Sequence, residues 1–323
     1  MDKEKRIYGL LVGCAYGDAM GMPSEMMSEK IFHKAFCQKI DSFLPSTPYD
    51  FFNRKFQKYQ VTDDTMNTLL ICDSILKNQG KFSVESYLAL LEEWMQKHSD
   101  MNSYIIGPST KRALEGIKNG VSMKETGKQV TTNGACMKST PLGIICDYHK
   151  LSHLVDTVYS MCLPTHNTNI AIMGTSVLVS LVSYILRDGT SVEEMWDIMY
   201  QCMDIAKDKG NQLPSPSLKK RMQIVQSNQL TINQLQELFG SGMETIETVP
   251  MVLAIVFSSS FDPIRAANVA ANLYGDTDTI GAIATAICGA YNCKFKAEDI
   301  KNLEKVNSIN FKYYAEHLKK YFV

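Results

Sequence analysis

The chain has 323 residues, 45% of them apolar, and its 33 basic and 34 acidic side chains nearly cancel in charge. This length and apolar content can build a sizeable core in one large domain or in two ordinary ones. Because the charge is balanced, a nucleic acid or another polyanion is disfavoured as a partner. The charged N-terminus precedes a short apolar run broken at Asp18, which fits neither a signal peptide nor a membrane-spanning helix, so we expect no membrane partner.

Nine cysteines are scattered along the chain without a Cys-x-x-Cys pair. An odd number without that spacing argues against a disulfide framework and against a zinc ribbon. Most of them lie in apolar surroundings, such as Leu70-Ile71-Cys72, where packing as small hydrophobic side chains accounts for them. We therefore expect a reduced, cytoplasmic protein.

The first predicted element is an N-terminal helix that contains Gly13, Gly17 and Gly21. Glycine at every fourth position lets the backbone of this helix approach another helix closely. Gly21 and Pro23 are expected to end the helix and to leave Glu25 in the following turn. A carboxylate in that turn can orient or deprotonate a water bound to a metal.

The next segment, roughly residues 33–59, lacks clear periodicity and carries the aromatic and basic run Phe51-Phe52-Asn53-Arg54-Lys55-Phe56. A stretch of this length without a helical pattern is predicted to be a long functional loop. After it comes the first acidic cluster, Thr62-Asp63-Asp64-Thr65, which runs into an apolar segment predicted as a helix.

Most of the remaining chain has helical apolar spacing, as at Leu88, Leu91 and Met95, and strand-like alternation is nearly absent. Helix starts are predicted at Ser83, Ser191 and Asp262-Pro263. The longest apolar stretch, residues 170–186, is interrupted by serine and threonine, which favours a buried core helix over a membrane span. About a dozen helices of ordinary length fit between these signals. Since no linker divides the chain, we predict an all-α fold, a single-domain orthogonal multi-helix bundle over residues 1–323.

The second acidic cluster, Asp276-Thr277-Asp278-Thr279, follows the first by more than two hundred residues and also runs into an apolar segment. Four carboxylates in two short turns repel one another unless a cation lies between them, and an all-oxygen set suits Mg²⁺, Mn²⁺ or Ca²⁺. Helix capping is the alternative, because Asp and Thr before an apolar run accept the free N–H groups of a helix start. Each cluster contains two carboxylates, whereas a helix cap needs only one side chain. If the fold brings the clusters together, they make a metal centre.

Five segments, in the same order, resemble the motif set of the ADP-ribosylglycohydrolase family, and the resemblance covers about residues 8 to 292. They are Gly17-Asp18-Ala19-Met20-Gly21-Met22-Pro23-Ser24-Glu25, Thr62-Asp63-Asp64-Thr65, Thr132-Asn133-Gly134-Ala135-Cys136-Met137-Lys138, Leu163-Pro164-Thr165-His166 and Gly275-Asp276-Thr277-Asp278-Thr279. The resemblance implies a nearly all-helical single domain that holds two divalent cations, usually Mg²⁺ and in some members Mn²⁺. Within this dinitrogenase reductase-activating glycohydrolase-like family, the chain resembles a bacterial subgroup associated with free nucleosides. The segments that carry this resemblance are Thr165-His166, Thr245-Ile246-Glu247-Thr248-Val249-Pro250 and Ala286-Ile287-Cys288-Gly289-Ala290.

The resemblance further implies roles for individual residues. The metal ligands would be Thr62, Asp63, Asp64, Asp276, Asp278 and Thr279. Glu25, together with Asp64, would handle protons at the reacting carbon. Substrate contacts would come from Gly107, Thr110, Asn133, Gly134, Ala135, Met137 and His166. From the residues themselves we add Asp18, and Tyr274, whose phenol beside the metal cleft could stack on a base or narrow the pocket. For His166, a structural role as a hydrogen-bonded residue at a helix start stays open.

The implied reaction is hydrolysis of an N- or O-glycosidic bond at the anomeric carbon of a ribose. The expected substrate is an ADP-ribosylated protein or another small ribosylated molecule. Two alternatives stay open: a ribonucleoside hydrolase on the same dinuclear centre, and a catalytically silent binding or structural relative. Lys138 stands where many members have arginine, and Tyr274 stands where glycine is usual, so the family resemblance alone does not fix the substrate.

Overall fold

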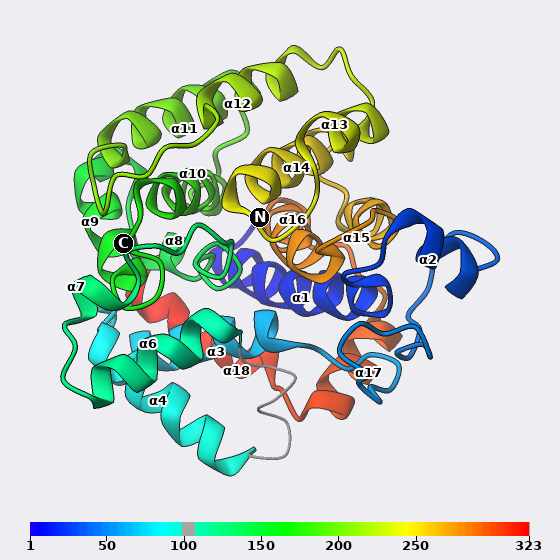
Figure 1. Ribbon diagram of the computed structural model, residues 1–323, viewed down its shortest axis with the longest axis horizontal. Coiled ribbons are helices and arrows are strands. Elements are labelled where there is room, and N and C mark those ends of the chain that lie inside the picture. Colours follow the sequence, from blue (N-terminus) through cyan, green and yellow to red (C-terminus); the bar gives the residue numbers. More distant parts are fainter. Residues whose placement is uncertain (99–106, 323) are drawn as a thin grey trace. The chain divides into compact units, whose positions relative to one another are not determined.

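The computed structural model of the protein describes residues 1–98 and 107–322, and all regular elements in these residues are helices (Figure 1). The only strand-like features there are two isolated bridges, Met27 with Gly275 and Thr168 with Asn211. The elements, in chain order, are α1 (Lys3–Gly21), η1 (Met22–Ser24), α2 (Glu29–Ala35), α3 (Asp63–Lys77), α4 (Val84–Lys97), α6 (Pro108–Lys118), α7 (Met123–Thr126), α8 (Leu142–Ile145), η2 (Tyr148–Lys150), α9 (Leu151–Cys162), α10 (Asn169–Leu186), α11 (Val192–Ala206), α12 (Leu218–Ser227), α13 (Ile232–Phe239), α14 (Thr245–Ser258), α15 (Pro263–Ala271), α16 (Thr277–Tyr291), α17 (Ala297–Asn307), α18 (Phe311–Leu318) and η3 (Lys319–Tyr321). The all-α prediction is confirmed.

The three predicted helix starts are confirmed by their hydrogen bonds. The side chains of Ser83 and Ser191 accept from the backbone N–H groups of Ser86 and Glu194 at the starts of α4 and α11. Asp262 accepts from the N–H of Arg265, with Pro263 at the first position of α15. These caps satisfy N–H groups that have no partner inside the helix.

The contacts divide the chain into two compact units. Unit 1 comprises residues 1–66 and 217–316, and unit 2 comprises residues 67–216 and 317–323. The first turn of α3 therefore belongs to unit 1 and the rest of that helix to unit 2. The prediction of a single domain stays a prediction.

Unit 1 is organised around the contact between α1 and α16 (Figure 1). A Cβ atom added at Gly17 would lie 2.0 Å from the carbonyl oxygen of Gly281, and one added at Gly13 would lie 2.3 Å from that of Thr285. No side chain fits at such distances, so the glycines allow the two backbones to touch. The predicted close approach of the N-terminal helix is confirmed. Because α16 begins at Thr277, this contact brings the end of α1 to the second acidic cluster.

Unit 2 has α10 in its core, packed against α8, α9 and α11. Among the described residues, α10 is the one helix long and apolar enough to cross a membrane, with a mean hydropathy of 1.8, and 89% of it is buried inside the protein. A soluble protein's core helix has the same properties. The prediction of a buried helix at residues 170–186 is confirmed.

Candidate active site

The turn after α1 and the start of α16 hold their carboxylates together in unit 1. Glu25 follows η1, as predicted from Gly21 and Pro23. The backbone bridge between Met27 and Gly275 joins the chain just after Glu25 to the chain just before Asp276. As a result, carboxylate oxygens of Glu25, Asp276 and Asp278 all lie within 4.8 Å of one another. All three residues are buried.

The first acidic cluster reaches the same region through Asp18. The carboxylate of Asp18, on α1, accepts hydrogen bonds from the backbone N–H groups of Thr62 (3.0 Å) and Thr65 (3.1 Å) and from the Thr65 hydroxyl. Asp18 therefore caps α3 from another helix and fixes its first turn. A side chain outside the acidic cluster therefore provides part of the capping at the start of α3. The role of Asp18 as a substrate contact stays a prediction.

Capping does not account for the second cluster either. Asp276 occupies the N-cap position of α16, but its side chain makes no capping hydrogen bond. Thr277 donates its hydroxyl to the carbonyl oxygen of Gly21 (2.8 Å) and accepts from Ser24 (3.1 Å), which ties the turn to the end of α1. Asp278 accepts from the backbone N–H of Thr279 (2.9 Å). The Asp276 side chain therefore does not cap α16.

The carboxylates of this site are buried close together and repel one another when they are ionised. Burial raises the pKa of Asp64 and of Asp278 well above the usual value, and the charge of Asp278 raises that of Asp64 further. The charge of Glu25 and its side-chain hydrogen bond to Asp278 also raise the pKa of Asp278. For Glu25 itself, burial raises the pKa to about 7, partly opposed by the charge of Arg54.

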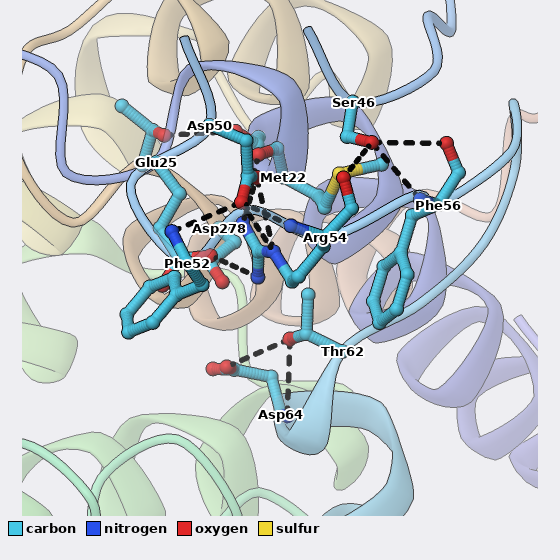
Figure 2. A network of polar contacts seen from close by, with 12 residues as sticks. Met22, Glu25, Ser46, Asp50, Phe52, Arg54, Phe56, Thr62, Asp64 and Asp278 are labelled. Atoms are coloured by element: carbon cyan, nitrogen blue, oxygen red, sulfur yellow. Dashed lines mark hydrogen bonds and ion pairs between the residues drawn. The ribbon is translucent and has the colours of Figure 1, made fainter. Parts of the chain in front are cut away.

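An oxygen donor set of this kind fits a divalent cation. Asp64 Oδ1 is buried and has no hydrogen-bond partner within the described part of the chain. The Thr62 hydroxyl, a further oxygen in the same turn, lies 3.2 Å from Asp64 Oδ2. Buried carboxylates that repel one another, with an oxygen left without a donor, are the ligands that Mg²⁺ or Mn²⁺ prefers. Figure 2 shows Thr62 and Asp64 below Asp278 and Glu25.

One residue of this site was missed by sequence reasoning. Arg54 lies in the predicted loop, and its Nη1 is 2.6 Å from Glu25 Oε2. The loop prediction is right for residues 36–59, which hold no helix, but residues 33–35 belong to α2. There the buried Phe32 side chain anchors a short helical segment that apolar periodicity cannot reveal. The aromatic and basic composition around Arg54 was the only signal in the sequence.

In unit 2, the glycine-containing loop and His166 come together. His166 Nε2 lies 3.2 Å from the Thr132 hydroxyl, and Nδ1 lies 2.8 Å from the Thr165 hydroxyl. A Cβ added at Gly134 would lie 2.9 Å from the His166 ring, so this position needs glycine. Lys138 donates to the Gly134 carbonyl oxygen (2.7 Å). Burial, aided by Lys138, holds the pKa of His166 well below its usual value and keeps the ring neutral.

The remaining predicted contacts lie in different surroundings. Asn133, Ala135 and Met137 are buried in the same loop as Gly134. Gly107 occupies the N-cap position of α6, with Thr110 in the first turn of that helix. Tyr274, in unit 1, lines a cavity of about 1310 Å³ together with Phe32, His33 and Asn272. Its phenol oxygen lies 3.4 Å from Glu29 Oε1. The roles of all these residues in binding substrate stay predictions.

Comparison with known proteins decides the family. Residues 1–293 match the model of the ADP-ribosylglycohydrolase family. The chain belongs to the ADP-ribosylglycohydrolase family. Proteins of this family are hydrolases of glycosidic bonds, so the predictions of the family and of a glycosidase are confirmed.

Two relatives and one solved structure show how the resemblance is distributed. The chain is 35% identical to the uncharacterized protein YegU of Escherichia coli K12, over 99% of this chain and 98% of that protein. It is 24% identical to the ADP-ribosylarginine hydrolase Tri1 of Pseudomonas putida GB-1, over 88% of this chain and 70% of that protein. A structure titled ADP-ribosylglycohydrolase-related protein complex matches with a TM-score of 0.72 at 20% identity, over 99% of each chain. This last match shows the fold.

Proposed function

We propose that this ADP-ribosylglycohydrolase hydrolyses the glycosidic bond at the anomeric carbon of a ribose in an ADP-ribosyl group, with the help of two divalent cations. The convergence of the two acidic turns carries the proposal. Asp18 caps the first turn of α3, Asp276 makes no capping hydrogen bond at the start of α16, and Asp64 Oδ1 is buried without a hydrogen-bond partner among the described residues. The proposed ligands are Thr62, Asp63, Asp64, Asp276, Asp278 and Thr279. Mg²⁺ is the expected cation, with Mn²⁺ as the alternative.

Bound cations would supply Lewis acidity and would orient the ribose hydroxyls. Residues of the chain itself are proposed to transfer the proton and to hold the ligands in place. Glu25 is buried beside Asp276 and Asp278, where its carboxylate is placed to accept and return a proton. Asp64, whose Oδ1 has no donor, is proposed to assist it. Asp18 holds Asp63 and Asp64 in place through the first turn of α3.

The unit 2 loop is proposed to bind the diphosphate and ribose of the substrate through Asn133, Gly134, Ala135 and Met137. Backbone N–H groups beside a glycine are suited to an anion because no Cβ shields them. His166 is neutral, so it can accept or donate a hydrogen bond without a charge. Gly107 and Thr110, at the exposed start of α6, are proposed as further contacts; an added Cβ at Gly107 would meet no atom within 4 Å.

The substrate is proposed to be an ADP-ribosylated protein or metabolite, in agreement with the relative Tri1, which is named an ADP-ribosylarginine hydrolase. Free ribonucleosides are the alternative. Tyr274 is proposed to influence this choice, because an aromatic ring on a cavity wall can stack on a planar group.

The test is a substrate panel assayed with Mg²⁺ and with Mn²⁺. It contains ADP-ribosyl-arginine, ADP-ribosyl-serine, O-acetyl-ADP-ribose, uridine and inosine. Release of ADP-ribose from one of the first three, lost in Glu25→Gln by a factor on the order of 10² to 10⁴, supports the proposal. Asp197→Asn, an exposed carboxylate on α11, is the matched control and should keep full activity. Turnover of uridine or inosine alone would replace ADP-ribosyl hydrolysis by nucleoside hydrolysis, and turnover of none would refute both.

A further inference from the structure

The segment just before the first acidic turn is held by a helix from the other end of the chain. Residues 59–61 lie outside the helices and lead directly into Thr62 and the start of α3. Helix α17 makes hydrogen bonds to this segment, although it follows it by more than two hundred residues. The segment, the first turn of α3 and α17 all belong to unit 1.

Asn307, the last residue of α17, makes two of these hydrogen bonds. Its Oδ1 accepts from the backbone N–H of Val61 (3.1 Å), and its Nδ2 donates to the carbonyl oxygen of Tyr59 (2.8 Å). Nδ2 also donates to the carbonyl oxygen of Leu303 (2.9 Å), one turn earlier in α17. Because an amide side chain has both donors and an acceptor, Asn307 fixes the two peptide groups on either side of residue 60 and ties them to its own helix.

A third contact of α17 holds the side chain of Tyr59. The Tyr59 hydroxyl donates to Asp299 Oδ1 (3.0 Å), while Asp299 Oδ2 accepts from the hydroxyl of Tyr16 on α1 (3.3 Å). Tyr59 has a φ of 70°, a left-handed backbone conformation that a bulky residue rarely adopts. Such a conformation persists where surrounding contacts hold it, and Asp299 and Asn307 provide contacts of this kind.

The position of this segment affects the acidic turn directly. The backbone N–H of Thr62 donates to the Asp18 carboxylate (3.0 Å), one residue after the N–H that Asn307 holds. Only the two backbone torsions of Val61 separate these two peptide groups, since the peptide groups themselves are planar. The orientation of Thr62, whose hydroxyl lies 3.2 Å from Asp64 Oδ2, is therefore set from α17 on one side and from α1 on the other.

We propose that Asn307 is a positioning residue for the cation centre: together with Asp299, it holds residues 59–61 so that Thr62, Asp63 and Asp64 are in place before a cation binds. This inference rests on the proposed function of the same site. Helix α17 begins after residue 293, where the match to the family model ends, so none of the family's motifs includes this contact. A structural role alone would lower the stability of the fold without a specific effect on cation binding.

The test is a titration of the metal-free full chain with Mn²⁺, in which electron paramagnetic resonance measures the free ion. Asn307→Ala should weaken the binding of at least one Mn²⁺ ion by about tenfold, as the loss of a group that orients metal ligands does. Asn310→Ala is the matched control. The Asn310 side chain accepts from the backbone N–H of Tyr313 at the start of α18 (2.9 Å), close to α17 in the chain, and the control should bind Mn²⁺ as the wild type does.

Thermal unfolding in EDTA separates positioning from stability. Both variants lose a hydrogen bond from a side chain to the backbone, so both should unfold at a lower temperature than the wild type, but only Asn307→Ala should bind Mn²⁺ more weakly. Unchanged Mn²⁺ affinity in Asn307→Ala, or equal weakening in Asn310→Ala, would overturn the inference. Absence of Mn²⁺ binding to the wild type would instead overturn the proposed function itself.

Two milder variants cover the case in which Asn307→Ala does not fold. Tyr59→Phe removes the hydroxyl and keeps the ring, and Asp299→Ala removes the acceptor of the same hydrogen bond. Each should weaken Mn²⁺ binding by about threefold, the effect of one hydrogen bond. The double variant should lose no more affinity than Asp299→Ala alone, because both changes remove one contact. Tyr49→Phe, at an exposed tyrosine of the same loop, is the control. Full Mn²⁺ affinity in both single variants, or losses that add in the double variant, would overturn the positioning role of α17.

Discussion

The contact between α1 and α16 makes a strong prediction for Gly17→Ala. Ordinary contact with a Cβ begins at 3.4 Å, but the added methyl group would lie 2.0 Å from the carbonyl oxygen of Gly281. The two backbones would therefore have to part by about 1.4 Å, and overpacking of this kind costs about 1–3 kcal/mol or more. Alanine regains about 1 kcal/mol of helix propensity, which does not offset a clash between rigid backbones. Because the clash is between rigid backbones, we take the upper end of that range, about 3 kcal/mol, and after subtracting about 1 kcal/mol of helix propensity we expect a net loss of about 2 kcal/mol in the free energy of unfolding.

Thermal and urea unfolding with excess EDTA measure this loss. Gly116→Ala, inside α6, is the matched control, because its added Cβ would lie 2.9 Å from the methyl group of Thr126 and 3.8 Å from Val121, and would meet no backbone atom of another segment within 4 Å. Gly17→Ala should also weaken Mg²⁺ binding, since α1 carries Asp18 and α16 carries Asp278. An unfolding midpoint for Gly17→Ala equal to or above that of the wild type would refute the argument for close backbone packing.

Three further predictions follow from the buried carboxylates and the cavity wall. Burial raises the pKa of Glu25 and Asp63 to about 7, so the folded protein holds these protons more tightly than the unfolded chain does. In EDTA, the free energy of unfolding should therefore be greatest near a pH of about 4, the pKa of these carboxyl groups in the unfolded chain, and should fall as the pH rises through about 7. Saturating Mg²⁺ should suppress this fall, as measured by thermal scans. Asp64→Asn should raise the unfolding midpoint in EDTA, because it removes a carboxylate that its acidic neighbours repel. The same variant should lose the increase in midpoint that Mg²⁺ causes in the wild type. A normal increase with Mg²⁺ would argue against Asp64 as a ligand. Tyr274→Ala should change KM ratios across the substrate panel while leaving Mg²⁺ affinity unaltered, and unchanged ratios would remove Tyr274 from the substrate site.

Features encoded within a few residues were predictable. Ser83, Ser191 and Asp262 begin helices because a side-chain oxygen beside an apolar run satisfies free backbone N–H groups whatever the rest of the chain does. The glycines spaced by four in α1 indicated a close helix contact. Their partner, α16, could not be known, since the pattern says how near a neighbour lies and not which segment it is.

The parts of the site that escaped prediction depend on contacts between distant segments. Asp18 accepts a hydrogen bond from the start of α3 across 44 residues, and no local pattern indicates that contact. Arg54 meets Glu25 from a segment without periodicity, where no repeating pattern indicates the direction of a side chain. The short helices α7 and α8 have four residues each, too few for a helical period to show.

The central claim is that two acidic turns form one divalent-cation centre. Calorimetric titration of Mg²⁺ into the metal-free wild type, Asp63→Ala, Asp278→Ala and the control Asp197→Asn tests it most directly. Two Mg²⁺ ions should bind the wild type and the control, and each of the other variants should lose at least one of them. Absence of binding to the wild type, or unchanged binding in both Asp63→Ala and Asp278→Ala, would contradict the account.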